Sequence, residues 1–130
     1  MKKLLTKEQI VKLKSNGSYE NQDQDHVPVV MLTIPYTDCV WLISEIIPED
    51  ENIGFGLCDI GQGTPELGYV NLKELAISQK LIGMPVYNNP LFRGKYPMSA
   101  YTEAAQQACA IIWNEKIVKR HVKWFRKLGF

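Results

Sequence analysis

The chain has 130 residues, the size of one ordinary domain, and its 45% hydrophobic and 22% charged composition is close to the globular average. This composition excludes a disordered acidic tail, a collagen-like fibre and a disulfide-dense miniprotein. No apolar run approaches the roughly 18 residues of a membrane span, and the basic start never reaches the apolar core of a signal peptide. We therefore expect one cytoplasmic domain, residues 1–130, without a membrane partner.

The cysteines Cys39, Cys58 and Cys109 are odd in number and widely spaced. No C-x-x-C pair is present, so neither a zinc site nor a dithiol redox motif is indicated. We expect three reduced, largely buried thiols, as in cytosolic proteins.

The net charge of +1 hides a strong asymmetry along the chain. Segments 1–14, 15–72, 73–110 and 111–130 carry net charges of +4, −10, +2 and +5. A surface built this way is expected to have an acidic and a basic sector. Either the two sectors neutralise each other, within the fold or across a homodimer, or one of them meets a charged partner.

The first predicted element is a short helix. Thr6 and Gln9 have the spacing of a capping box, and Gly17 is a natural C-terminal cap. The polar residues 18–26 follow as a loop.

Three apolar, β-branched runs follow, and short turns separate them. They predict strands at 27–34, 40–47 and 53–60, joined as an antiparallel meander. Our register places Trp41, Glu45 and Asp59 on one face, whereas Gly54 and Gly56 lie on the other face, which we expect a helix to cover. A slip of one residue would exchange the two faces.

The second half of the chain predicts two helices. Asn71 caps one, with Glu74 at its third position, and this helix ends before Gly83. Residues 69–70 are a short extended piece, and residues 84–87 are a candidate short strand. Ser99 would cap a last helix that runs to about Lys127, with an apolar line through Ala104, Ala108, Ile111, Val118, Val122 and Phe125. The predicted class is α+β: a small antiparallel sheet of three to five strands, helices packed on one face, and a long amphipathic C-terminal helix.

Three patterns invite a catalytic or ligand-binding interpretation. The loop 61–68 is rich in glycine but lacks a lysine, so a tight turn with positive φ is favoured over phosphate binding. Cys58 and His26 would form a nucleophile–base pair only if they met, and our register points Cys58 to the covered face. We therefore expect no catalytic residue from this pair and no cofactor.

Carboxylates form the third pattern, because Glu45, Asp59 and Glu66 come from the predicted sheet and its adjoining loop. Together they would bind a hard cation or act as an acid–base pair. Separately they would accept hydrogen bonds from loop amides or pair with lysines. We favour the second arrangement and expect no metal, while a small carboxylate-based, metal-dependent enzyme stays open.

The C-terminal end interleaves basic and aromatic residues, a pattern that suits phosphates and stacked bases. The candidate nucleic-acid contacts are Lys116, Lys119, Arg120, Lys123, Trp124, Arg126 and Lys127. The alternative is an ordinary amphipathic helix with solvated lysines.

Residues 54–75, GFGLCDIGQGTPELGYVNLKEL, resemble the signature of a family of short bacterial proteins classed as a domain of unknown function. The runs LLTKEQIVKL, VPVVML, WLISE and MSAY follow the same family in order, so the resemblance covers a common core of about 3–110. Residues 111–130 are a basic extension. The resemblance implies a setting on plasmids, conjugative elements and phages, and singles out Trp41 and Tyr69 beside the carboxylates.

These observations favour a non-catalytic accessory protein of a mobile genetic element that binds a basic protein partner, with counter-defence as one role that fits. The candidate contacts are the acidic residues Glu45, Glu49, Asp50, Glu51, Asp59 and Glu66. Nucleic-acid binding through the C-terminal helix is the alternative, and a homodimer is compatible with either function.

Overall fold

The computed structural model describes residues 4–122, except for the side chains of residues 80–82. A five-stranded antiparallel sheet forms its centre, in the order β4-β3-β2-β1-β5. The strands are β1 (Val30–Thr33), β2 (Cys39–Ile46), β3 (Ile53–Ile60), β4 (Glu66–Asn71) and β5 (Tyr87–Asn88). The helices are α1 (Lys7–Gly17), α2 (Leu72–Ile82), α3 (Met98–Ala108) and α4 (Glu115–Lys119). The antiparallel meander and the α+β class are confirmed.

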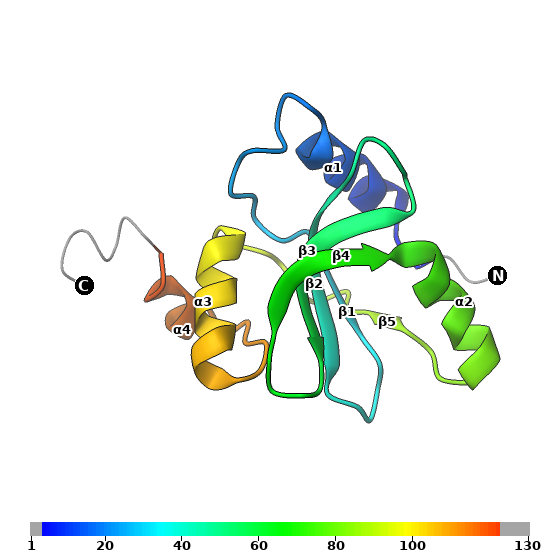
Figure 1. Cartoon of the computed structure of the whole chain (residues 1–130). Helices are drawn as coiled ribbons and strands as arrows, with labels where there is room; N and C mark the ends of the chain where they lie inside the picture. The colour runs from blue at the N-terminus through cyan, green and yellow to red at the C-terminus, as the bar shows by residue number, and fades with distance from the viewer. Residues whose placement is uncertain (1–3, 123–130) are drawn as a thin grey trace.

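Helices cover both faces of the sheet, so the prediction of helices on one face is wrong (Figure 1). One cluster joins Met31, Leu42 and Leu57 of the sheet to buried residues of α3 and α4. The other joins Val30 and Ile43, among others, to residues of α1 and α2. Because apolar residues occupy both alternating positions of β1 and β2, both faces require cover.

Trp41 lies in the cluster under α1 and α2, which corrects our placement of Trp41 beside Glu45 and Asp59. The pairing of β2 with β3 shifts between Ile43 and Glu45, so Ser44 is an extra residue in β2. This β-bulge interrupts the alternation of side chains along β2, so residues before and after it that are an even number of positions apart lie on opposite faces of the sheet. Our register was therefore correct at Glu45 and one residue out at Trp41.

Helix α1 docks on the sheet at this bulge. A Cβ atom placed on Gly17 would lie 1.8 Å from the carbonyl oxygen of Ile46, so only glycine allows the contact. The buried Asn16 donates a hydrogen bond of 2.9 Å from Nδ2 to the carbonyl oxygen of Ser44. Gly17 is thus a packing residue within the helix, and the C-cap that we assigned to it is Ser18.

The predicted long C-terminal helix is not formed in the described part of the chain. Helix α3 ends at Cys109, which has a positive φ of 59°, and Asn114 caps the separate, short α4. The break returns Ile111, Val118 and Val122 to the core beneath α3. Residues 123–127, where we extended the helix, lie outside the described residues.

Helix α3 also begins differently from our expectation. Ser99 caps nothing, because the helix begins at Met98. Asp25, in the loop between α1 and β1, accepts hydrogen bonds from both Ser99 N and Ser99 Oγ. All three cysteines are free thiols, but the expected burial is not found: Cys109 is exposed, and Cys39 and Cys58 are only half-buried. Between residues 4 and 122, no helix has the length and hydropathy of a membrane span.

Candidate functional site

One candidate site is a groove between α1 and α2 on one face of the sheet. We call it the lysine-rimmed groove. Its lining residues are Leu4, Leu5, Lys7, Ile10, Lys14, Ile46, Glu51, Asn52, Leu72 and Lys73. Its volume is about 380 Å³, within the usual range of ligand pockets.

Local signals place the first wall. The amide of Thr6 donates to Gln9 Oε1 at 3.0 Å, and the amide of Gln9 donates to Thr6 Oγ1 at 3.1 Å, so the predicted capping box is confirmed. The cap fixes where α1 begins, with Leu5 just before it. Ile10, one turn into α1, then lies on the same side as Leu5 and contributes to the groove.

The second wall is the start of α2. Asn71 accepts a hydrogen bond of 2.9 Å from the amide of Glu74, which confirms the predicted cap. The amide of Leu72 donates to the carbonyl oxygen of Asn52 at 2.7 Å and ties α2 to the turn between β2 and β3. These contacts hold Leu72 and Lys73 opposite α1.

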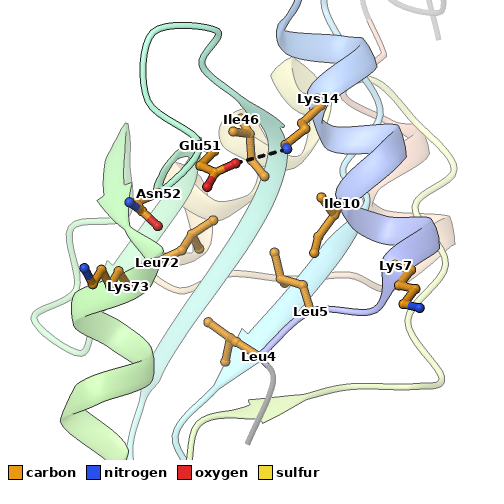
Figure 2. A pocket seen from close by; sticks show the side chains of 10 residues that line it. All are labelled: Leu4, Leu5, Lys7, Ile10, Lys14, Ile46, Glu51, Asn52, Leu72 and Lys73. Atoms are coloured by element: carbon orange, nitrogen blue, oxygen red, sulfur yellow. Dashed lines mark hydrogen bonds and ion pairs between the residues drawn. The ribbon is translucent and has the colours of Figure 1, made fainter. Parts of the chain in front are cut away.

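Figure 2 shows how the groove is arranged. The side chains of Leu4, Leu5 and Ile10 gather between the two helices, with Leu72 on the opposite wall. The three on the α1 side are only half-buried, whereas Leu72 is buried. Apolar side chains in an open groove favour an apolar group from another molecule.

Lysines stand around this apolar floor. Lys7 on α1 and Lys73 on α2 lie at opposite edges, are exposed, and form no ion pair with the described residues. Lys14 donates to Glu51 across one end at 3.3 Å, with half of its side chain exposed. An exposed pair of this kind contributes only about 0–1 kcal/mol, so a carboxylate from a ligand can compete with Glu51.

The predicted acidic residues are divided between different parts of the fold. Glu49, Asp50 and Glu51 lie in the exposed turn between β2 and β3. There Tyr19 Oη donates to Glu49 at 3.1 Å, and this hydrogen bond raises the pKa of Tyr19 above its ordinary value. Together with Lys14–Glu51, the contacts pair part of the acidic turn with α1 and the loop that follows it.

The carboxylates of the sheet do not meet. Glu45 and Asp59 lie on the α3 face, because they share it with Phe55 and Leu57. Asp59, however, lies four positions along β3 from Phe55, the partner of Glu45. Glu66 pairs with Cys58 and therefore lies on the opposite face. Among residues 4–122, no group of three side chains able to hold a metal is found.

Asp59 has the structural role that we favoured. Its side chain is buried and accepts a hydrogen bond of 2.9 Å from the amide of Gly61. Gly61 and Gly63 have φ values of 84° and 78°, so the predicted tight turn is confirmed. Asp59 closes this turn rather than presenting an acid–base group.

Glu45 is half-buried, and burial raises the pKa of its carboxyl above the ordinary value, while the nearby His26 lowers it. Since Cys58 packs with the α1 and α2 cluster, it lies on the face opposite Glu45 and His26. Burial also raises the pKa of the Cys58 thiol, which opposes thiolate formation. The candidate nucleophile–base pair is not assembled.

The remaining predicted residues lie apart from the groove. Tyr69 is exposed on β4 and packs edge-on against Phe55, with ring centroids 5.2 Å apart. Lys116, Lys119 and Arg120 are exposed on or just after α4. The candidates Lys123, Trp124, Arg126 and Lys127 lie outside the described residues.

Sequence reasoning missed the lysine-rimmed groove, because its residues come from separate segments. The available signals were the capping box, the apolar Leu5 and Ile10, and five lysines within residues 1–14. We interpreted these lysines as a general basic sector. Nothing in the sequence indicated that Leu72 and Lys73 would face them.

The fold is that of a small α+β protein with helices on both faces of an antiparallel sheet and, among the described residues, no group of three side chains able to hold a metal. The chain belongs to the DUF2958 family, described as a protein of unknown function, which matches residues 4–112. No curated protein matches the chain. No solved structure matches it either.

Proposed function

We propose that the protein is a non-catalytic binding module whose lysine-rimmed groove receives a segment of a partner protein. The observation that carries the proposal is an apolar floor, Leu5, Ile10 and Leu72, with Lys7 and Lys73 on its two sides, neither of which forms an ion pair within residues 4–122. The complementary ligand is a segment with large apolar side chains flanked by carboxylates. An amphipathic acidic helix has this pattern.

Charges on both walls favour a peptide segment over a small anion. Lys7 and Lys73 belong to different helices, so a ligand uses both only if it carries carboxylates at two places around its apolar side chains. A ligand with one carboxylate would pair with one wall. Rim charges of this kind increase association rate and specificity more than affinity.

Selection from a displayed library of random peptides tests this function. We expect enrichment of peptides in which Asp or Glu flanks Leu, Ile or Phe, with binding that weakens as salt rises. Ile10→Asp should abolish binding, and Lys73→Glu should weaken it and move the selection toward basic peptides. Val11→Asp, on the exposed side of α1, is the matched control. Enrichment of basic peptides by the wild type would contradict the proposal.

The acidic turn supports a different function, in which a basic protein binds Glu49, Asp50 and Glu51. The two proposals separate experimentally. In a double variant with Glu49→Gln and Asp50→Asn, the affinity of the groove for an acidic ligand should stay the same or increase, because negative charge beside the groove decreases. The same double variant should bind more weakly to a basic partner that contacts this turn.

Nucleic-acid binding is kept as an alternative because Lys116, Lys119 and Arg120 are exposed together. Nuclease treatment of material captured from a bacterial lysate, with and without charge reversal at Lys116 and Arg120, tests it. The mobile-element setting and the counter-defence role rest on the family resemblance alone. The genes that flank this one, and challenge of a host carrying it with a phage, would test them.

A further inference from the structure

The two edges of the sheet differ strongly. The edge strand β5 has two residues, whereas β4 has six and pairs only with β3 among the described strands. Strand β4 contains no lysine, proline or register shift. These are the devices that usually prevent an edge strand from pairing with another chain.

The side chains of β4 are also open to a neighbour. Leu67 and Tyr69 are 44% and 70% exposed, and both lie on the α3 face because they pair with Leu57 and Phe55. Nothing lies within 4 Å of a Cβ atom placed on Gly68. Glu66, at the start of the strand, is the only charged residue of β4.

We propose that β4 pairs antiparallel with β4 of a second copy, about a two-fold axis at Gly68, so that the two sheets become continuous. Directly opposed residues of such a sheet lie on the same face. This register opposes Leu67 to Tyr69 of the second copy, and Tyr69 to its Leu67. Gly68 opposes itself.

The charges of the strand permit this arrangement. Glu66 opposes the uncharged Val70, so no like charges face each other across the new pair. A two-fold axis at Tyr69 also preserves the faces. It opposes Leu67 to the polar Asn71 and loses both aliphatic–aromatic pairs. The strand is therefore most complementary to a second copy of itself in the register centred on Gly68.

Cysteine crosslinking tests the register directly. The test uses a Cys109→Ser background, which removes the exposed thiol. In this background Gly68→Cys should form a disulfide-linked dimer when diamide is added as the oxidant. Diamide takes up the two electrons and two protons that the paired thiols lose. Val70→Cys, on the same strand and face, should remain monomeric, because its two-fold copy is displaced along the strand. Equal crosslinking of the two variants, or none at Gly68→Cys, would overturn the register.

Sedimentation velocity of the unmodified full chain tests the dimer itself. We expect a reversible monomer–dimer equilibrium from low micromolar to near-millimolar concentration. Leu67→Lys combined with Tyr69→Lys should raise the dimer dissociation constant by about tenfold or more. Tyr87→Lys, on the opposite edge, should leave it unchanged, and circular dichroism melts verify that all variants fold. A wild-type chain that stays monomeric throughout refutes the proposal, whichever ligand the groove binds.

Discussion

Gly17 and Asn16 fix the position of α1 on the sheet, each by a different contact. Gly17 allows the helix backbone to lie in close contact with the backbone of Ile46, and Asn16 donates a hydrogen bond to the carbonyl oxygen of Ser44 at the bulge. Both contacts lie beside the lysine-rimmed groove, which also includes Ile46. The shape of the groove therefore depends on two residues that do not line it.

Gly17→Ala should destabilise the fold strongly, because the new Cβ would lie within 1.8 Å of a backbone oxygen that cannot move independently. Overpacking of this kind costs about 1–3 kcal/mol or more. Thermal unfolding measures the effect. Gly68→Ala is the control, since its Cβ would meet nothing, and an equal loss in both variants would contradict the packing explanation.

Glu45 gives a prediction about pH. Its pKa is raised above the ordinary 4.5 because burial disfavours the charged carboxylate, so folding carries a penalty once the group ionises in the unfolded chain. The Glu45 contribution is therefore most favourable below the unfolded pKa and is lost as pH rises through the folded pKa. Glu45→Gln should raise the melting temperature at neutral pH but not in acid.

The matched control for this prediction is Glu66→Gln, which alters an exposed carboxylate of β4. It should change the melting temperature little at either pH. A Glu45→Gln variant that is less stable at neutral pH would show that a favourable interaction with His26 outweighs the cost of burial.

At the scale of whole elements, the expected strands and helices formed, but some boundaries differ. Strand β4 covers Glu66–Asn71, where we expected a loop to residue 68 and a short extended piece at 69–70. The range 53–60 predicted for β3 and the end of α2 before Gly83 are confirmed. The start that we predicted for α3 was wrong. The group that accepts hydrogen bonds from its first turn is Asp25, which lies in a loop more than seventy residues earlier. A local search for a cap cannot find such a partner.

Asp25→Ala should therefore weaken α3 as the loss of a capping residue would, by about 0.5–2 kcal/mol. Denaturant unfolding measures this change. Asp23→Ala removes an exposed carboxylate from the same loop and should have little effect. If the two variants lose equal stability, the loss reflects the charge of the loop rather than the contact with Ser99.

At the scale of the whole molecule, two apolar clusters on opposite faces of the sheet include residues of all four helices of the described chain. The end of the described chain belongs to the core, because Val118 and Val122 are buried beneath α3. The basic segment that we treated as an extension thus completes the fold with its apolar residues. Its lysines Lys116 and Lys119 are exposed.

Val118→Ala should cost about 2 kcal/mol of stability, from two lost methyl groups and the cavity that they leave. Lys116→Ala, on the exposed side of α4, should be nearly neutral. Denaturant unfolding distinguishes them. A Val118→Ala variant as stable as the wild type would show that α4 is not needed to close the core.

The sequence by itself determined the α+β class, the meander, the N-terminal caps of α1 and α2 and the tight turn at Gly61 and Gly63, because each depends on residues close together in the chain. Only the tertiary structure decided which face Trp41 occupies, where the C-terminal helix breaks, and that Lys7 and Lys73 stand across one groove. Asn16 of α1 donates a hydrogen bond to the carbonyl oxygen of Ser44 at the bulge, and the groove depends on α1 and α2 meeting across the sheet. Contacts between distant segments have no local pattern, and they determine the candidate site.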